Sequence, residues 1–401
     1  MATDIPRYDL LLKGGHVIDP ANDVEATMDV AVRDGVVAAV SPDILGERAA
    51  SIIDVSGFYV TPGIIDIHTH VYRGIGLSVA ADPLAVRGGV TTQVDAGSSG
   101  CDNFGNFKDT VIDIARTRVL VLLNIARCGM TAQEQNLAQM DPIAAAETIA
   151  EYPEHIVGLK SAHYMGAGFE PIDHAVHAGR LNGTPVMVDF WVKPTATYED
   201  LLLKHLRPGD MHTHIYARQF PLLDDESRVQ DYVWEARKRG VLFDLGHGGG
   251  SFWFRIAAPA ITQGFGPDSI STDLHRSSAL LPAATMDVTM SKLLNLGLPL
   301  PDVIRRSTMN PARQIQRPQL GTLSVGSPAD IAVFSLHEGE HGFIDSGHTK
   351  MRGTRRLVCQ LTFRDGQVLW DLEGISCPDW DVSGDYDYID RPPLPRHDWP
   401  A

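Results

Sequence analysis

Two kinds of hydrophobic pattern follow one another along the chain. Residues 8–60 hold short runs rich in β-branched and other apolar residues, separated by turns that contain Gly and Asp. The same pattern returns from residue 321, in GTLSVGSPADIAVFSL and RLVCQLTFRDGQVLW. Such runs are typical of small antiparallel strands and not of a helical domain. We therefore expect the two ends of the chain to pair into one sheet.

The middle of the chain alternates differently. Apolar runs of strand length are separated by helical stretches such as residues 226–240, which predicts parallel strands joined by crossover helices. Eight such runs can be counted, and eight strands close a β/α barrel. The runs are GIIDIHTH, VTTQVDAG, RVLVLLNIA, IVGLKSAH, PVMVDF, MHTHIYA, VLFDLGHGG and SISTDLH.

Side chains able to bind metals or protons cluster at the carboxyl ends of these runs. They are His68, His70, Asp95, Lys160, His163, Asp189, His214, His247, Asp273 and His275. The carboxyl ends of the strands are where β/α-barrel enzymes build their active sites. The sequence therefore predicts one active site at this end of the barrel.

Composition narrows the class of partner. The 34 Lys and Arg residues against 50 Asp and Glu residues give a net charge of −16, without a basic run suited to nucleic acid or an anionic membrane. No apolar run approaches the roughly 20 residues of a membrane span, and the first residues lack a secretory pattern. The four cysteines are scattered, which fits reduced thiols. We expect a cytoplasmic protein with a small-molecule substrate.

The segment TPGIIDIHTH suggests a metal site. His68 and His70 stand two residues apart on a predicted strand, so both imidazoles face the same side and could bind one cation. An H-x-H pair also occurs in exposed loops. The pair gains weight because further candidate ligands follow at later strand ends.

Lys160 follows an apolar strand, where burial disfavours the charged ammonium and lowers the pKa of the amine. A neutral lysine can add carbon dioxide, and the resulting carbamate can bridge two divalent ions. The alternative is a lysine that forms a salt bridge or reaches solvent. The surrounding histidines favour the carbamate.

Two further candidates come from the sixth and eighth runs. His214 ends the sixth run, and His212 lies on the same predicted face, so one of the two is expected to reach a metal. Asp273 ends the eighth run, where a carboxylate can bind a metal and take a proton from water. The alternative for Asp273 is a helix N-cap for the segment that follows.

Other residues near the strand ends could contact substrate. In GHGGGSF, the imidazole of His247 and the backbone amide of Gly248 could bind a carbonyl oxygen or a carboxylate. A tight turn that needs glycine is the alternative. His163, Tyr72 and Arg276 are further substrate-binding candidates, each with an ordinary structural role as its alternative.

Taken together, these segments resemble the amidohydrolase superfamily over nearly the full length of the chain. The resemblance is carried by PGIIDIHTH, VGLK, GDMHTHIYA, DLGHGGGSF, STDLH, NPAR and the late GTLSVGSPADIAVF. Within the superfamily the chain looks closest to the dihydroorotase-like deacetylases, including those that act on acetylated hydroxy acids such as acetyl-mandelate.

The resemblance implies a fold of class α/β. A TIM-type (β/α)8 barrel would span residues 62–320, and a small composite β-sandwich would combine residues 1–61 with residues 321–401. It also implies two divalent metal ions, with zinc as the first expectation and manganese as the alternative. Relatives usually form homo-oligomers, so we expect one here.

The same resemblance assigns the ligands residue by residue. His68, His70 and Asp273 would bind the more buried ion, N6-carboxylated Lys160 would bridge, and His214 would bind the second ion. The family usually has a histidine at the end of strand five, where this chain has Asp189. Asp189 is either an oxygen ligand, which favours harder ions such as manganese or magnesium, or the mark of a single-metal site.

The activity implied is hydrolysis of an amide or ester bond, of deacylase or deacetylase type, in a small carboxylate-bearing substrate by metal-activated hydroxide. Asp273 would be the catalytic proton carrier. The alternatives are a cyclic amidohydrolase of the dihydroorotase or hydantoinase kind, a peptidase acting on acylated D-amino acids, and a non-catalytic relative that keeps the barrel.

Overall fold

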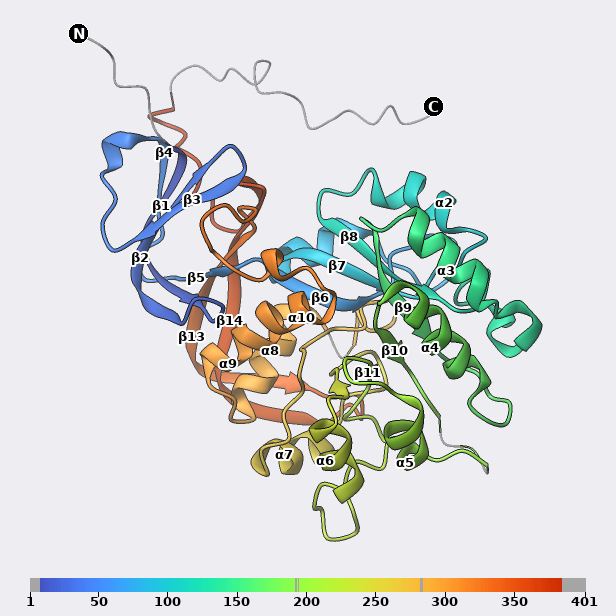
Figure 1. The fold of residues 1–401 in the computed structure, drawn as a ribbon. Helices are drawn as coiled ribbons and strands as arrows, with labels where there is room; N and C mark the ends of the chain where they lie inside the picture. Colours follow the sequence, from blue (N-terminus) through green and yellow to red (C-terminus); the bar gives the residue numbers. More distant parts are fainter. Residues whose placement is uncertain (1–7, 192, 194, 282–283, 384–401) are drawn as a thin grey trace.

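Two β-sheets organise the computed structural model of the chain (Figure 1). The structure describes residues 8–191, 193, 195–281 and 284–383. The proline-rich segment RPPLPRHDWP, residues 391–400, has a composition that predicts an extended chain, and it lies outside the described residues. Within the described part of the chain, no helix is long and apolar enough to cross a membrane.

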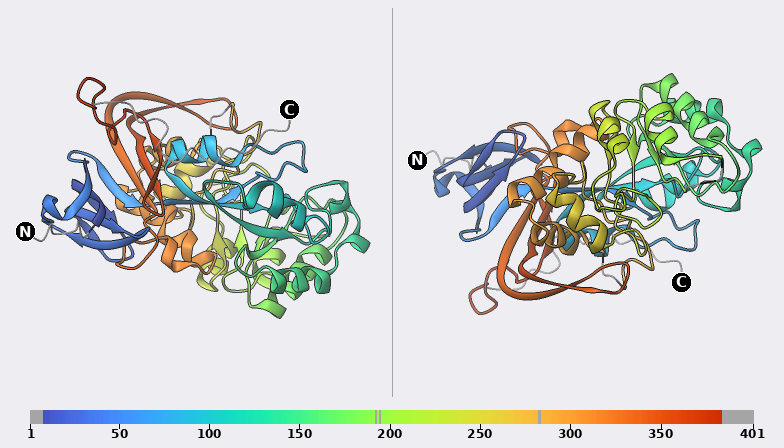
Figure 2. Two further views of the ribbon diagram at one scale, coloured as in Figure 1. Left: turned by 90° about the horizontal axis from the view of Figure 1, so that it is seen from above. Right: turned by 90° about the horizontal axis from the view of Figure 1, so that it is seen from below.

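The first sheet combines strands from both ends of the chain, as the sequence pattern predicts. Its order is β15-β14-β13-β5-β1-β2-β3, with β4 paired to β1. The junction is antiparallel, with Ile331 of β13 opposite Pro62 of β5. Figure 2 shows these strands gathered at one end of the molecule. Their bounds are β1 Tyr8–Asp19, β2 Val24–Arg33, β3 Val36–Ser41, β4 Ala49–Asp54, β5 Tyr59–Pro62, β13 Ile331–Ile344, β14 Lys350–Arg364 and β15 Gln367–Asp371.

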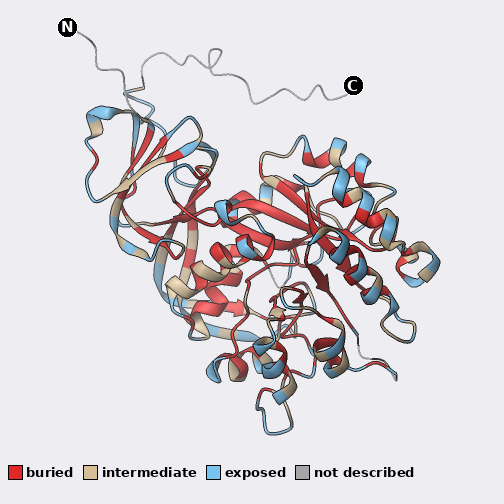
Figure 3. Ribbon diagram, viewed as in Figure 1, coloured by how far each residue is buried: buried red, intermediate tan, exposed pale blue. Residues whose placement is uncertain are grey.

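The second sheet is parallel, and its strands follow one another in chain order from β6 to β12. This order arises when each crossover connection places the next strand beside the preceding one, always on the same side. The strands are β6 Ile64–Thr69, β7 Val90–Ala96, β8 Arg118–Asn124, β9 Ile156–Ser161, β10 Val186–Val188, β11 Met211–His212 and β12 Leu242–Phe243. Every residue of β6, β7 and β9 is buried, as expected for parallel strands covered on both faces (Figure 3).

Helices connect and cover the parallel strands. Asp141 caps the first turn of α3 by accepting the amide N–H groups of Ile143 and Ala144. Gly183, in the left-handed region, ends α4. The α-helices are α1 Ala81–Ala85, α2 Phe104–Phe107, α3 Pro142–Glu151, α4 Glu170–Asn182, α5 Tyr198–Asp200, α6 Asp231–Lys238, α7 Phe254–Thr262, α8 Met286–Asn295, α9 Leu300–Ser307 and α10 Met309–Gln314.

The eighth apolar run, residues 269–275, does not form a regular strand, which corrects the sequence prediction. It makes single parallel bridges to both edges of the sheet, Asp244 with Ser269 and Thr69 with Leu274. Its backbone is irregular because Asp273 adopts a φ of 46°, outside the extended region. The run nevertheless links β12 to β6, so the sheet curls and both of its edges are hydrogen-bonded.

The strands divide their side chains between an apolar core and a polar end. Residues of β6, β7, β8, β9, β10 and β11 form one apolar cluster, which also includes Ala312 and Ile315 from the region of α10. The polar residues that the sequence analysis singled out follow the carboxyl ends of the same strands. The sheet therefore presents its candidate chemistry at one end only.

Candidate active site

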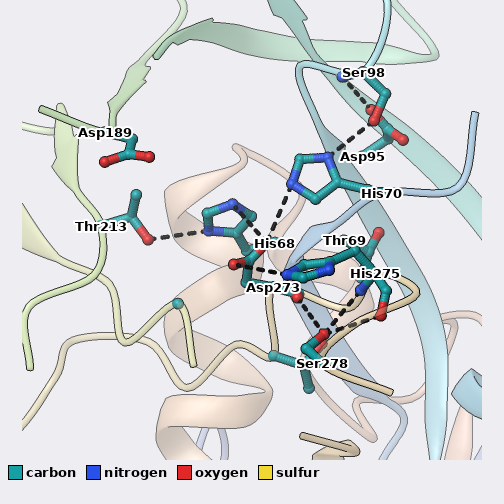
Figure 4. A network of polar contacts seen from close by, with 12 residues as sticks. His68, Thr69, His70, Asp95, Ser98, Asp189, Thr213, Asp273, His275 and Ser278 are labelled. Carbon is teal, nitrogen blue, oxygen red and sulfur yellow. Dashed lines mark hydrogen bonds and ion pairs between the residues drawn. The ribbon is translucent and has the colours of Figure 1, made fainter. Parts of the chain in front are cut away.

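Three side chains converge at the carboxyl end of β6. His68 Nε2 lies 3.6 Å and His70 Nε2 lies 3.2 Å from Asp273 Oδ1. Figure 4 shows both rings turned toward this carboxylate. All three residues are buried, and their donor atoms lie close enough to hold one metal ion. The H-x-H motif and the aspartate of the eighth run therefore meet, as expected from the sequence.

In both histidines, the ring nitrogen that points away from Asp273 has a hydrogen-bond partner. His70 Nδ1 lies 2.9 Å from Ser98 Oγ, and His68 Nδ1 lies 3.0 Å from Thr213 Oγ1. Because the Thr213 hydroxyl donates its proton to Asp244, its oxygen accepts from His68 Nδ1. That assignment leaves His68 Nε2 unprotonated and facing the cluster. Burial lowers the pKa of His68 to about 3, which keeps the ring in the neutral form that a metal ligand requires.

Two buried carboxylates, for which the sequence predicted no role, fix this arrangement. Asp244 accepts hydrogen bonds from Thr213, Ser269 and Ser271, and so ties the sixth strand end to residues 269–275. Asp66 accepts the backbone N–H of Thr272 at 3.0 Å, and burial raises the pKa of Asp66 to about 7. Asp66 lies inside β6 and Asp244 directly follows β12, but the hydrophobic pattern of these strands does not reveal the partners of either carboxylate.

Lys160 lies within the same cluster and is 2% exposed. Its Nζ is 3.2 Å from His68 Nε2 and 3.5 Å from Met187 Sδ. In the described part of the chain, no carboxylate oxygen lies within ion-pair distance of Nζ. Burial lowers the pKa of Lys160, with nearby carboxylates opposing it. The salt-bridge alternative is therefore not what the structure shows.

A second group of candidate ligand atoms surrounds Asp189, which follows β10. Asp189 Oδ2 lies 3.5 Å from His214 Nε2 and 3.4 Å from His163 Nε2. His214 Nδ1 donates to the Gly246 carbonyl at 2.7 Å, which leaves its Nε2 free to face Asp189. His214 has a φ of 63°, and this break in the strand sends His212 elsewhere. The ring of His212 packs against Tyr198 and Phe220, so the expectation that both histidines share a face is wrong.

A cavity of about 430 Å³ opens over these groups. A deeper pocket of about 100 Å³ shares with it the residues His163, Asp189, His214, Asp273 and His275. Gly249, Gly250 and Ser251 line the outer cavity. Another cavity, of about 490 Å³, lies at the opposite end of the sheet, where its lining includes Arg207 and Asp210, which are paired with each other. Its lining holds none of the strand-end residues, so the smaller cavities mark the site.

The remaining substrate-binding candidates are placed differently from one another. His163 lines both pockets, whereas His247, Tyr72 and Arg276 line neither. Tyr72 packs on Phe107 and donates to Asn106, and Arg276 is exposed. Gly248 has a φ of 51°, and a Cβ there would lie 2.3 Å from Asp273 Oδ2. Its role is to let the backbone pass close to that carboxylate.

His247 turns away from the cavity. Its ring is fully buried and stacks on Phe252 with 4.7 Å between ring centroids, and its Nε2 lies 2.7 Å from Lys292 Nζ of α8. The glycines around His247 explain this placement, because Gly246 and Gly248 both have positive φ and break the alternation of a strand. The His247–Lys292 pair therefore supports the loop that carries Gly249 and Gly250.

The Lys292→Met variant should change how stability depends on pH. Burial lowers the pKa of Lys292 to about 7, against about 10.4 in an unfolded chain. Between these values the folded state binds fewer protons than the unfolded state, so the free energy of unfolding rises with pH by up to about 1.4 kcal/mol per unit. We expect urea unfolding at pH 7.5, 8.5 and 9.5 to show this rise in the native protein but not in the variant. If the free energy of unfolding changed equally with pH in both proteins, the lowered pKa of Lys292 would be contradicted.

Comparisons with known proteins agree with this geometry. The model of the Amidohydrolase family matches residues 255–369. A deacetylase from Enterococcus faecalis is 33% identical over 90% of this chain and 99% of its own length. The solved structure of an adenine deaminase has a TM-score of 0.84 and 30% identity, covering 91% of this chain and all of its own. The solved structure of a dihydroorotase has a TM-score of 0.80 and 30% identity, and the match covers 90% of this chain and 99% of the dihydroorotase chain.

The curled parallel sheet carries His68, His70 and Asp273 at its carboxyl end, in an arrangement that could hold a metal ion. The chain belongs to the amidohydrolase family, and within it to the deacetylase branch. It is a hydrolase that acts on amide bonds. The resemblance stated from the sequence motifs is thus confirmed.

Proposed function

We propose that the protein removes a small acyl group, acetate in the simplest case, from an amide or ester of a small carboxylate-bearing molecule. The convergence of His68, His70 and Asp273 beneath a cavity of about 430 Å³ carries this proposal. The name of the Enterococcus faecalis relative supports deacetylation over ring opening or deamination, because that relative matches nearly its full length. Cyclic amide hydrolysis is the alternative.

The donor atoms fit a pair of divalent ions, with zinc as the first expectation and manganese as the alternative. His68, His70 and Asp273 would hold one ion, and His214 and Asp189 the other. N6-carboxylated Lys160 would bridge them, since its buried amine has a neutral imidazole and a thioether as neighbours. Bound ions would lower the pKa of a water molecule and polarise the acyl carbonyl.

The chain's own groups then divide the remaining work. The Asp273 carboxylate, beside two imidazole nitrogens, accepts the proton of the attacking water and passes it to the departing nitrogen or oxygen. Gly248 keeps the backbone close to Asp273, so the carboxylate has little freedom to turn away. Gly249 and Gly250 line the cavity, and their backbone amides would hold the substrate carboxylate.

A substrate panel tests the reaction. Purified protein should release acetate from N-acetyl amino acids or O-acetyl hydroxy acids, measured by a coupled acetate assay. Under the same conditions it should leave dihydroorotate and hydantoins unopened, measured by the loss of ring absorbance. Ring opening without acyl release would replace the proposal with its alternative, and inactivity on both classes would refute it.

The setting of the enzyme is proposed on the same basis. Residues 62–320 would form a (β/α)8 barrel, with residues 269–275 in the eighth position, and residues 1–61 and 321–401 a composite β-sandwich. The net charge of −16 suits a cytoplasmic protein without nucleic-acid partners. A homo-oligomer is expected from its relatives, and light scattering of the purified protein would measure it.

A further inference from the structure

The two groups of ligand atoms are built alike. In the first, Asp273 Oδ1 is approached by His70 Nε2 at 3.2 Å and His68 Nε2 at 3.6 Å. In the second, Asp189 Oδ2 is approached by His163 Nε2 at 3.4 Å and His214 Nε2 at 3.5 Å. Two atoms that ligate one zinc ion tetrahedrally at about 2.1 Å lie about 3.4 Å apart. Both groups show this spacing between carboxylate and imidazole.

We propose that His163 is a metal ligand, and that it completes with Asp189 and His214 the site for the second divalent ion. The inference rests on the proposed function, because it assumes that the enzyme uses metal ions. It gives His163 a different role from the substrate contact expected from the sequence.

The orientation of the His163 ring supports a ligand role. Its Nδ1 lies 2.9 Å from Glu134 Oε2, and the other oxygen of Glu134 accepts from Asn124 Nδ2 at 2.7 Å. Glu134 is 4% exposed, so the carboxylate is a fixed, buried partner. A metal-binding histidine characteristically donates the N–H of its second ring nitrogen to a carboxylate. This hydrogen bond sets the tautomer and orients the unprotonated nitrogen toward the metal. His163 Nε2 is thereby aimed at Asp189 and the cavity.

Gln135, the residue after Glu134, holds the backbone around His163. His163 has a φ of 58°, a conformation that costs energy in a residue with a Cβ. Gln135 Nε2 donates to the His163 carbonyl at 2.6 Å, and Gln135 Oε1 accepts the Met165 N–H at 2.9 Å. Glu134 and Gln135, which are adjacent in the sequence, therefore fix both the ring and the main chain of His163. A histidine that only contacts substrate would need neither of these interactions.

The rival explanation is an ordinary ion pair, in which His163 only neutralises Asp189. The two explanations differ in what a metal titration shows. A ligand contributes to the affinity of one ion, whereas a pairing partner can be replaced without the loss of an ion. The readout is metal binding and not turnover, so it is independent of the choice of substrate.

The test compares the full-length protein with His163→Asn, Glu134→Gln and the control His337→Asn, which changes an exposed histidine of β13. Metal-free protein is titrated with Zn²⁺ against a chromophoric chelator, and with Co²⁺ while the visible absorption of the bound ion is followed. Thermal unfolding of the metal-free forms shows that each variant is folded.

We expect two ions per chain in the native protein and in the control. His163→Asn should weaken the second ion at least about 100-fold and change the cobalt spectrum. Glu134→Gln should keep both ions but bind the second about 10- to 100-fold more weakly. Two ions with native affinities and an unchanged cobalt spectrum in His163→Asn would overturn the proposal, as would a native protein that binds a single ion with the same affinity as this variant. A native protein that binds two ions but releases no acyl group would refute the function and not the ligand assignment.

Discussion

Replacing Asp273 with asparagine should reduce kcat/KM for acyl hydrolysis by at least about 10³-fold while the protein stays folded. The amide keeps the size of the carboxylate and its place beside Gly248, but it cannot accept a proton from water. His68 and His70 remain, so most of the metal should stay bound. Initial rates of acetate release, together with metal content, measure the effect.

The matched control for this variant is Asp109→Asn, which removes an exposed carboxylate on the outside of the molecule. The control should keep native rates. If Asp273→Asn hydrolysed substrate at a rate within tenfold of the native enzyme, Asp273 would not be the proton carrier. If the variant lost its metal as well as its activity, the carboxylate would matter chiefly as a ligand.

Lys160→Ala should remove both activity and metal. Lys160 is buried beside both groups of candidate ligand atoms, 3.2 Å from His68, and its carbamate is the proposed bridge. Without the bridge we expect fewer than one tightly held ion per chain and a fall in turnover of at least about 10³-fold. Elemental analysis after dialysis and acetate release report the two losses separately.

The carbamate has a direct spectroscopic test. Native protein incubated with ¹³C-labelled bicarbonate should show a carbamate carbon resonance that Lys160→Ala lacks. Lys204→Ala, which removes an exposed lysine paired with Asp200, is the control and should keep the resonance. A Lys160→Ala protein that still holds two ions would rule out a bridging lysine.

Much of the site follows from the sequence because parallel strands bring their carboxyl ends together. His68, His70, Lys160, His214 and Asp273 were all singled out as strand-end residues, and the structure brings them within reach of one another. The paired ends of the chain follow from hydrophobic alternation in the same way. These patterns can be recognised in the sequence because burial of one or both faces of a strand dictates its residue types.

The rest depends on side-chain direction and on long-range partners. His247 stands at a strand end, yet Gly246 and Gly248 turn the chain and send its ring into the core. Glu134 lies in a short 3₁₀ helix, Ala132–Gln135, whose polar sequence resembles that of an exposed loop, and its link to His163 spans 29 residues. The eighth run pairs by isolated bridges because Asp273 leaves the extended conformation. No periodicity in the sequence encodes these three features.

Hydrolysis of acyl groups by this chain should depend on bound metal. Acetate release from the acyl panel would be followed for protein as purified, after removal of metal by a chelator, and after Zn²⁺ or Mn²⁺ is restored. We predict turnover that disappears with the metal and returns with it. Acyl hydrolysis that continues in protein shown to be metal-free would rule out a metal-dependent reaction.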